Sequence, residues 1–226
     1  MTLLLYAGSS RCSTSETGRL TRHSFSFGPH LDPSNLGFGP MICHNDDLLE
    51  PGAGYRDHPH TDLEIVTWVL EGVLIHTDDR GNSLELRPGD VQVMSAGSGV
   101  RHAEIADAAS GPTRFLQTWI RPDEPGTPPR WRVEPVAVGT ELTTVVGGDG
   151  LDIGTRGASL HIARLTSGST LHLPTAEQQH VFIARGSGRL HDLEIEAGDA
   201  VRLTDELGRE FEANANTELL IWTFTA

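Results

Sequence analysis

The sequence is 226 residues long and carries 31 acidic against 17 basic side chains, a formal net charge of −14. This length suits one large domain or two small ones, either of which can bury a core without disulfides or a structural metal. The excess of negative charge argues against direct binding to nucleic acid or to an anionic membrane, since both would repel the chain. Eleven histidines accompany only two cysteines, so any metal site would be built from imidazole and carboxylate, not from thiolate.

The compartment is predicted from the N-terminus and the cysteines. Residues 1–8 contain no basic segment and too short an apolar run for a signal peptide. No stretch approaches the roughly 20 apolar residues of a membrane span. Cys12 and Cys43 are interpreted as reduced thiols. We therefore expect a cytoplasmic protein.

Short runs rich in Val, Ile, Leu and Thr recur along the chain, and each is bounded by Gly, Pro, Asn or Asp. Runs of this length and composition are typical of β-strands. Two turn sequences, at residues 79–82 and 87–90, separate neighbouring runs. No long segment keeps a helical period, so the sequence predicts an all-β sandwich or barrel. The clearest strand candidates are Glu64–Leu70, Val91–Met94, Phe115–Ile120, His180–Ala184 and Glu218–Phe224.

An internal repeat indicates two related β units. Residues 58–72 align without gaps on residues 172–186, and residues 86–91 align on 195–200. The segment Arg121–Pro135 contains five prolines, which excludes a central strand and suggests the connection between the units. We expect a metal-binding N-terminal domain at residues 1–130 and a degenerate C-terminal domain without a metal site at residues 131–226.

Two pairs of metal-ligand residues stand out, each with i, i+2 spacing. His58 and His60 form the first pair, and His102 and Glu104 form the second. Side chains two apart on a strand leave from the same face, so each pair would point to one side. A single pair in a histidine-rich chain would be better interpreted as surface residues, but two pairs inside one long motif favour a metal site. Three imidazoles and one carboxylate suit Fe, Mn, Ni, Cu or Zn, and an octahedral ion would keep two open positions.

The motifs around these residues resemble a known family. Gly52-x5-His58-x-His60-x3-Glu64 with Gly72, and Gly89-x5-Ser95-Ala96-Gly97 with His102, are similar to the two cupin motifs. The extra residue before Gly72, the serine in place of proline and the two extra residues before His102 depart from ordinary cupins. These departures resemble the pirin family, as do further segments over about residues 22–130, among them 23–27, 32–33, 37–39, 51–54, 58–67, 94–104 and 117–120.

The resemblance implies a bicupin, made of two jelly-roll-like β-barrel domains, and a metal-dependent dioxygenase of the quercetin 2,3-dioxygenase type. It implies that His58, His60, His102 and Glu104 are the ligands of a divalent metal ion; the internal repeat, considered below, predicts one such ion per chain. Fe(II) is the favoured ion, and Mn, Ni, Cu and Zn are the alternatives. The substrates would be dioxygen and an aromatic, flavonol-like small molecule. Glu104 is also the candidate catalytic residue, which would take the proton of the substrate's 3-hydroxyl; the family's reaction then opens the heterocycle and releases carbon monoxide.

Two alternatives stay open at this point. Ordinary cupins use the glutamate of the first motif, and Glu64 would be in phase with His58 and His60 on a continuous strand. Glu64 is therefore a rival ligand, or a residue that orients a ligand imidazole, although the resemblance to pirins favours Glu104. Some pirins act as non-enzymatic, iron-binding regulators through a protein partner, so this function is the alternative to the enzyme.

The repeat also predicts that the second unit binds no metal. His58 aligns on His172, but the other ligand positions align on residues that bind no metal, and Phe211 and Ala213 are expected to fill the barrel interior. A single imidazole does not form a stable site, which needs three or four ligands. The aligned positions are Pro174 for His60, Gln178 for Glu64, Phe211 for His102 and Ala213 for Glu104.

Overall fold

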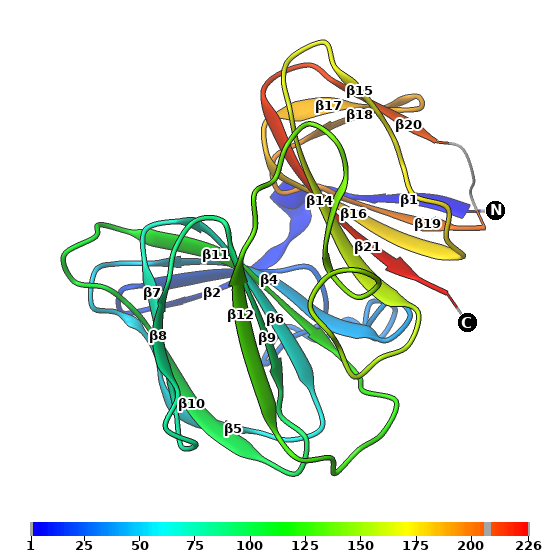
Figure 1. Cartoon of the computed structure of the whole chain (residues 1–226). Coiled ribbons are helices and arrows are strands. Elements are labelled where there is room, and N and C mark those ends of the chain that lie inside the picture. Colours follow the sequence, from blue (N-terminus) through cyan, green and yellow to red (C-terminus); the bar gives the residue numbers. More distant parts are fainter. Residues whose placement is uncertain (1, 206–208, 226) are drawn as a thin grey trace. The chain divides into compact units, whose positions relative to one another are not determined.

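The structure is a computed structural model that describes residues 2–205 and 209–225, and nearly all of its regular elements are β-strands (Figure 1). Each strand candidate from the sequence lies on a strand, and the two predicted turns join β7 (Leu74–Asp78) to β8 (Ser83–Leu86) and β8 to the next strand. The prediction of an all-β protein is confirmed. The five strands concerned are β6 (Glu64–Glu71), β9 (Asp90–Ser95), β11 (Thr113–Ile120), β16 (Gln178–Arg185) and β21 (Thr217–Phe224).

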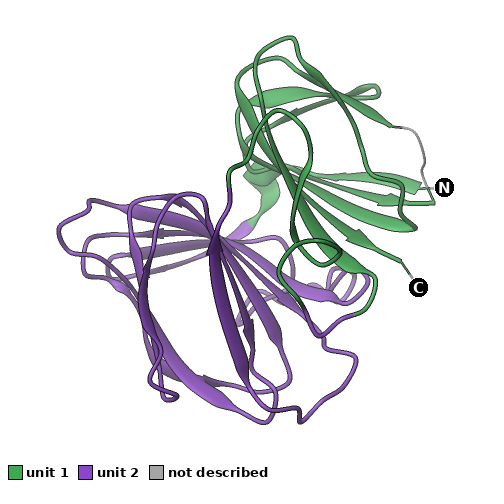
Figure 2. Ribbon diagram, viewed as in Figure 1, with its two compact units in different colours: residues 1–11, 137–152, 156–226 green, residues 12–136, 153–155 purple. Residues whose placement is uncertain are grey.

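The chain divides into two compact units (Figure 2). Unit 2 comprises residues 12–136 and 153–155, and unit 1 comprises residues 1–11, 137–152 and 156–226. Within the described residues, no helix has the length and hydrophobicity needed to cross a membrane.

Unit 2 is built from two antiparallel sheets. The smaller sheet has the order β5-β10-β7-β8 and adds β5 (Gly54–His60) and β10 (Val100–Ala106) to the strands already given. The larger sheet has the order β12-β9-β6-β11-β4-β3-β2, which adds β12 (Arg130–Pro135), β4 (Met41–Leu49), β3 (Arg19–His23) and β2 (Cys12–Glu16).

Unit 1 repeats this arrangement. Its sheets have the orders β1-β19-β16-β21-β14-β13 and β15-β20-β17-β18, so each strand from β14 onward corresponds to a strand of unit 2 in the same place. β16 begins and ends 114 residues after β6, which is the offset at which the repeat aligns in the sequence. The remaining strands are β1 (Thr2–Tyr6), β13 (Thr143–Val146), β14 (Ala158–Leu165), β15 (Thr170–His172), β17 (Ser187–Leu190), β18 (Leu193–Glu196), β19 (Ala200–Thr204) and β20 (Glu210–Ala213), and one short 3-10 helix, η1, spans Gly8–Ser10.

The unit boundaries differ from the division expected at residue 130. β1 pairs with β19, which places the N-terminal strand in unit 1. β12 lies in the proline-rich segment and pairs with β9 at the edge of unit 2. An edge strand tolerates proline because one side of it needs no ladder hydrogen bond, so the segment is partly strand and not only a connection.

The core of each unit lies between its two sheets. In unit 2, Leu74 and Leu86 from the small sheet pack with Val69 and Phe115 from the large one, and all four are fully buried. In unit 1, Phe211 belongs to the corresponding cluster. The small sheet of unit 2 turns one face toward this interior, and that face carries the site described below.

A buried carboxylate in unit 2 gives a first prediction, on pH. Asp47 on β4 is 1% exposed and accepts hydrogen bonds from Thr21 Oγ1 (2.6 Å) and Tyr55 Oη (2.5 Å). Burial raises its pKa to about 7, with these hydrogen bonds opposing the shift. The folded protein therefore binds a proton more tightly than the unfolded chain does. This contribution to stability is complete below the unfolded pKa and is lost as the pH rises through about 7.

The natural protein should lose stability between pH 5 and pH 8, whereas Asp47→Asn should not lose this contribution because asparagine does not titrate. The free energy of unfolding of Asp47→Asn minus that of the natural protein should therefore rise from pH 5 to pH 8. Urea unfolding of both proteins at the two pH values measures the difference. Asp32→Asn is the control, since Asp32 is exposed and its pKa is lowered by Ser34. A difference between the Asp47→Asn protein and the natural protein that does not change with pH would contradict the prediction.

Candidate metal centre

Three of the predicted ligands meet on neighbouring strands of the small sheet. His58 and His60 lie on β5, and His102 lies directly opposite His58 on β10. The ring centroids are 4.4 Å apart for His58 and His102, 4.8 Å for His58 and His60, and 5.1 Å for His60 and His102. Pro59, between the two β5 histidines, is exposed. The shared face expected from i, i+2 spacing is therefore present in the structure.

A register shift in the β5–β10 pair shapes this face. His102 is opposite His58, whereas Glu104 is opposite Tyr55, so β5 has one more residue between the pairs than β10 does. Such a bulge bends a strand and re-aims its side chains. The next pair joins Gly54 to Ile105. A Cβ at residue 54 would lie 2.1 Å from the backbone oxygen of Glu104, so the close approach of the two strands requires glycine there.

Buried residues on β10 alternate with exposed or half-buried ones, which turns His102 and Glu104 inward and Arg101 outward. Arg101 forms an ion pair with Asp57. Glu104 is 1% exposed, and Gln117 Nε2 donates to both of its carboxylate oxygens at 3.0 and 2.9 Å. Trp119 Nε1 donates to Gln117 Oε1 at 2.9 Å. Because an indole N–H only donates, it fixes the amide so that the NH2 group faces Glu104.

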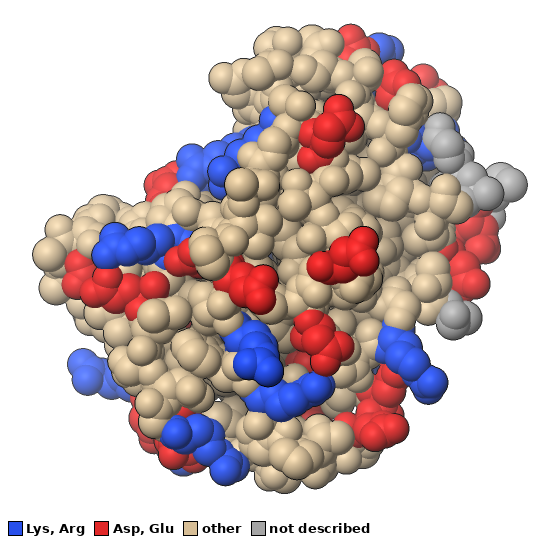
Figure 3. All heavy atoms as spheres, viewed as in Figure 1, with Lys and Arg blue, Asp and Glu red and all other residues tan. Residues whose placement is uncertain are grey.

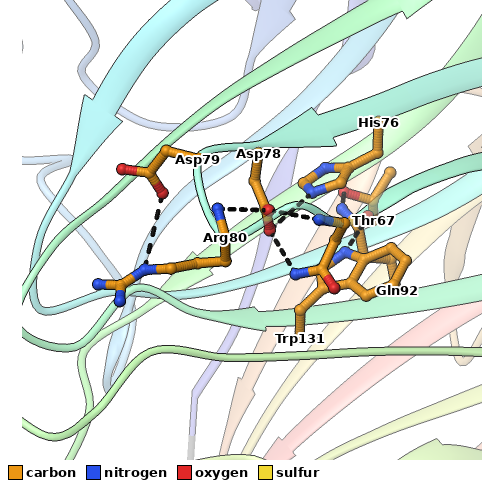
Figure 4. Close-up of polar contacts among 8 residues, drawn as sticks. Thr67, His76, Asp78, Asp79, Arg80, Gln92 and Trp131 are labelled. Carbon is orange, nitrogen blue, oxygen red and sulfur yellow. Dashed lines mark hydrogen bonds and ion pairs between the residues drawn. The ribbon is translucent and has the colours of Figure 1, made fainter.

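His76 is a member of the site that the sequence analysis missed. It lies on β7 opposite Glu104 and is fully buried. Its ring centroid is 5.3 Å from that of His102, and it stacks on Trp131 at 5.2 Å with an interplanar angle of 18°. Its Nε2 lies 3.6 Å from Asp78 Oδ2 (Figure 4). His76 and Asp78 have the same i, i+2 spacing as the two predicted pairs, and this signal could have found them.

Burial shifts the titration of these groups. It lowers the pKa of His60 to about 3 and that of His102 to about 3, and in each case the neighbouring histidines lower it further. Both rings are therefore neutral at pH 7, which is the form that binds metal. Burial raises the pKa of Glu104, and the hydrogen bond from Gln117 opposes this rise.

The donor set fits a divalent metal ion. Among the described residues, His60 Nε2 and both ring nitrogens of His102 and of His76 are buried without a hydrogen-bond partner, which is costly unless a ligand satisfies them. The described residues contain two groups of three whose ligand atoms lie within 4.8 Å of one another: His58, His60 and His102, and His76, His102 and Glu104. The structure therefore brings the predicted ligands His58, His60 and His102 together. The fourth, Glu104, lies close to His102 in the second group.

The rival carboxylate, Glu64, lies elsewhere. β5 ends at His60, and the chain turns at Asp62, which has a φ of 51°, before Glu64 begins β6 in the large sheet. Glu64 therefore does not continue the strand of the two histidines, contrary to the in-phase relation expected from the sequence. It accepts a hydrogen bond from Ser95 Oγ at 2.7 Å, and a Cβ on Gly154 would lie 2.6 Å from its Oε1.

The corresponding face of unit 1 carries apolar residues. Phe211 and Ala213 are buried in its core, as the repeat predicts. The residue opposite Phe211 is Leu171, whereas His172 is opposite Glu210. The β15–β20 register is thus shifted by one residue from the expected one, and His172 is directed outward, with 81% of its side chain exposed.

From this we predict one metal ion per chain. Elemental analysis of the natural protein and of His172→Ala should give the same ratio of metal to protein, near one. The reason is that His172 faces solvent, and within the described residues both groups of candidate ligands lie in unit 2. Two tightly bound ions per natural chain, with one lost in His172→Ala, would contradict this.

Comparison with known proteins agrees with this fold. The pirin family model matches residues 8–120, and the model for the quercetinase C-terminal cupin domain matches residues 147–223. A Mycobacterium tuberculosis (strain H37Rv) protein named "Putative quercetin 2,3-dioxygenase" is 42% identical over 225 residues, which cover 96% of this chain and 92% of that protein. The quercetin 2,3-dioxygenase of Escherichia coli K12 is 30% identical over 88% of this chain and 89% of its own length.

A solved structure shows the same architecture over the whole chain. The crystal structure of the bacterial pirin YhhW from Escherichia coli, in complex with nickel(II), matches with a TM-score of 0.92 and 28% sequence identity, covering 100% of both chains. The two-unit β architecture, the family models and the similarity to these relatives together show that this chain is a member of the pirin family, built from two cupin-type units.

Proposed function

We propose that this protein is a metal-dependent dioxygenase that cleaves a flavonol such as quercetin. The observation that carries the proposal is the cluster of imidazoles, half-buried on β5 and buried on β10, beside the buried carboxylate of Glu104. The names of the relatives support a flavonol as the substrate class. The nickel(II) in the Escherichia coli pirin supports a divalent ion, with Fe(II) as the favoured one here.

His58, His60, His102 and Glu104 would hold the ion. When bound, a divalent ion of this kind supplies Lewis acidity toward a flavonol hydroxyl and redox chemistry toward dioxygen. Glu104 would accept the proton of the 3-hydroxyl at a carboxylate oxygen, since burial raises its proton affinity. Gln117, fixed by Trp119, keeps this carboxylate oriented. The reaction would open the heterocycle and release carbon monoxide.

Aromatic side chains next to His60 suit an aromatic substrate. Trp119 contacts the ring of His60 edge-on at 5.0 Å, and Phe27 packs edge-on against Trp119 at 5.4 Å. Aromatic rings prefer such edge and offset contacts with one another, so a flavonol ring would find partners there.

The distribution of charge supports a small substrate over a nucleic acid. On the face shown in Figure 3, acidic and basic side chains are intermixed. Many arginines are paired with carboxylates and so are less available to phosphates. These pairs include Arg19–Glu16, Arg87–Glu85, Arg114–Asp46, Arg164–Glu218 and Arg189–Glu212.

The test is turnover of flavonols by protein loaded with Fe(II), Mn(II), Ni(II) or Cu(II). Quercetin loss, oxygen uptake and carbon monoxide release should occur in equal amounts, and protein stripped of metal should show none of them. Protein that binds one metal ion per chain and yet leaves a panel of flavonols unchanged would contradict the proposal and favour a regulator that acts through a protein partner.

A further inference from the structure

A row of three polar side chains crosses the interior face of the large sheet of unit 2. Thr67 on β6 is paired with Gln117 on β11 on one side and with Gln92 on β9 on the other, and all three are buried. Thr67 and Gln117 are two residues from Val69 and Phe115, which pack in the core, so the row faces the interior. Buried polar groups are costly unless they are hydrogen-bonded, so a function is needed to account for this row.

Unit 1 shows that the fold itself does not require polar residues at this place. At the offset of 114 residues that relates β16 to β6, the middle position of the row is Val181, and its partners on the neighbouring strands are Val201 and Ile221. All three are fully buried in the core of unit 1. The position of Glu104 is taken there by Ala213, which is also in the core. The polar row therefore accompanies the carboxylate of the metal centre and is apolar where that carboxylate is replaced.

Both glutamines of the row turn their NH2 groups toward its middle. Gln117 Nε2 and Gln92 Nε2 each donate to Thr67 Oγ1 at 3.3 Å. The amide oxygen of Gln117 accepts from Trp119 Nε1, and that of Gln92 accepts from Trp131 Nε1, both at 2.9 Å (Figure 4 for Gln92 and Trp131). Because an indole N–H only donates, each tryptophan holds the oxygen of its amide and so fixes the direction of the NH2 group.

Glu104 is the group that these amides meet from the small sheet. Gln117 Nε2 donates to its two carboxylate oxygens at 3.0 and 2.9 Å. Burial raises the pKa of Glu104, and side-chain hydrogen bonds from Gln117 and from Gln92 oppose the rise. An ionised carboxylate only accepts hydrogen bonds, so an amide turned the other way would place a carbonyl oxygen against it.

Trp131 is held in place independently of Gln92. It lies on β12, in the proline-rich segment Arg121–Pro135, and its ring stacks on His76 at 5.2 Å with an interplanar angle of 18°. Trp131 and Trp119 also pack against the same apolar cluster, which consists of Ile65, Met94, Ala96 and Val100. Each indole N–H therefore has a fixed position from which it can orient a glutamine.

We propose that Gln92 and Trp131 are positioning residues for Glu104. Together with Gln117 and Trp119 they form two matched arms, and each arm presents an amide NH2 group to the carboxylate and keeps it in the orientation that binds the ion. Gln92 acts on Glu104 directly, and Trp131 acts through Gln92. This inference rests on the proposed role of Glu104 as a ligand, and not on a flavonol as the substrate.

The test is a double-mutant cycle on Ni(II) affinity, measured by chelator competition with metal-free protein. Gln92→Met keeps the length of the side chain and removes the amide, and it should weaken Ni(II) binding by roughly 10–100-fold. Trp131→Phe keeps an aromatic ring beside His76 and removes only the N–H donor, so it should weaken binding by a smaller factor. The double variant should bind no more weakly than Gln92→Met alone, because Trp131 acts through Gln92. Trp222→Phe, which removes a buried indole from unit 1, is the control and should leave the affinity unchanged.

Two measurements on metal-free protein separate positioning from a structural role. Urea unfolding of Gln92→Met should stay close to that of the natural protein, since unit 1 has apolar residues in the same row; a structural residue would lower stability and leave affinity unchanged. In the natural protein, NMR should find slow solvent exchange of the Trp131 indole N–H, and this result does not depend on whether a variant folds.

Three results would each overturn the proposal: Trp131→Phe with the affinity of the natural protein, independent and additive losses in the double variant, or an indole N–H that exchanges freely. Losses that follow the cycle in a protein that leaves flavonols unchanged would refute the proposed dioxygenase and leave this inference standing. Flavonol turnover by the natural protein, with unchanged Ni(II) affinity in both single variants, would refute this inference alone.

Discussion

Replacement of His102 by alanine is expected to abolish tight binding of every divalent ion while the chain stays folded. His102 is the residue shared by both groups of ligands. Removal of a residue that only orients a ligand lowers metal affinity by roughly 10–100-fold. Removal of a ligand itself should lower the affinity by more than this. Chelator competition with Mn(II), Ni(II) and Cu(II) measures the loss, and His191→Ala, on the exposed surface of unit 1, is the control.

The stability of the metal-free His102→Ala protein should stay close to that of the natural protein. Alanine leaves a small cavity, which destabilises the fold, but it also removes two buried nitrogens without partners, each of which costs about 1–3 kcal/mol. None of the residues in the apolar cluster between the two sheets of unit 2 is a candidate metal ligand, so we expect the core to form without the metal. Loss of a cooperative thermal transition on metal removal from the natural protein would show instead that the ion is structural.

The strands and four of the five residues of the candidate centre could be predicted because their signals are local. Runs such as Glu64–Leu70 have apolar, β-branched composition and turn residues on both sides, and neither depends on a distant partner. The shared face of His58 and His60 follows from the two-residue period of a strand alone. His102 and Glu104 are directed inward for the same reason, and the structure shows β10 alternating accordingly.

The remaining features depend on pairings between distant residues. His76 joins the centre because β7 pairs with β10 in a register that places it opposite Glu104, and nothing near His76 in the sequence specifies that register. Likewise, residues 2–6 form β1, whose partner β19 lies at residues 200–204, and no local signal indicates that pairing. The sequence therefore indicates which segments are strands more reliably than which strands pair.

The position of Glu64 shows that a prediction from strand periodicity fails where a short turn interrupts the strand. Continuation of the two-residue period from His60 would place Glu64 on the face of the ligands. The left-handed conformation of Asp62 reverses the chain in between and moves Glu64 to the other sheet. Aspartate adopts this conformation more readily than most residues, but its sequence context did not mark the turn.

Glu104→Gln is expected to lower the turnover of flavonol by roughly 100–10,000-fold, the range typical for loss of a general base. Glutamine keeps the size of the side chain but removes the charge and the proton-accepting carboxylate. It also turns an NH2 group toward the NH2 of Gln117, whose orientation Trp119 fixes, so one buried donor loses its acceptor. The rate constant kcat per bound metal ion, measured beside metal content, separates the loss of the base from the loss of the ion.

Glu64→Gln is the matched control, because Glu64 is an equally buried carboxylate in the same unit and belongs to neither group of ligands among the described residues. Its Oε2 accepts a hydrogen bond from Ser95, which the amide oxygen of glutamine can also accept, so turnover should fall far less than in Glu104→Gln. A larger loss of turnover and of metal in Glu64→Gln than in Glu104→Gln would assign the carboxylate ligand to the first motif, as in ordinary cupins, and would remove Glu104 from the mechanism.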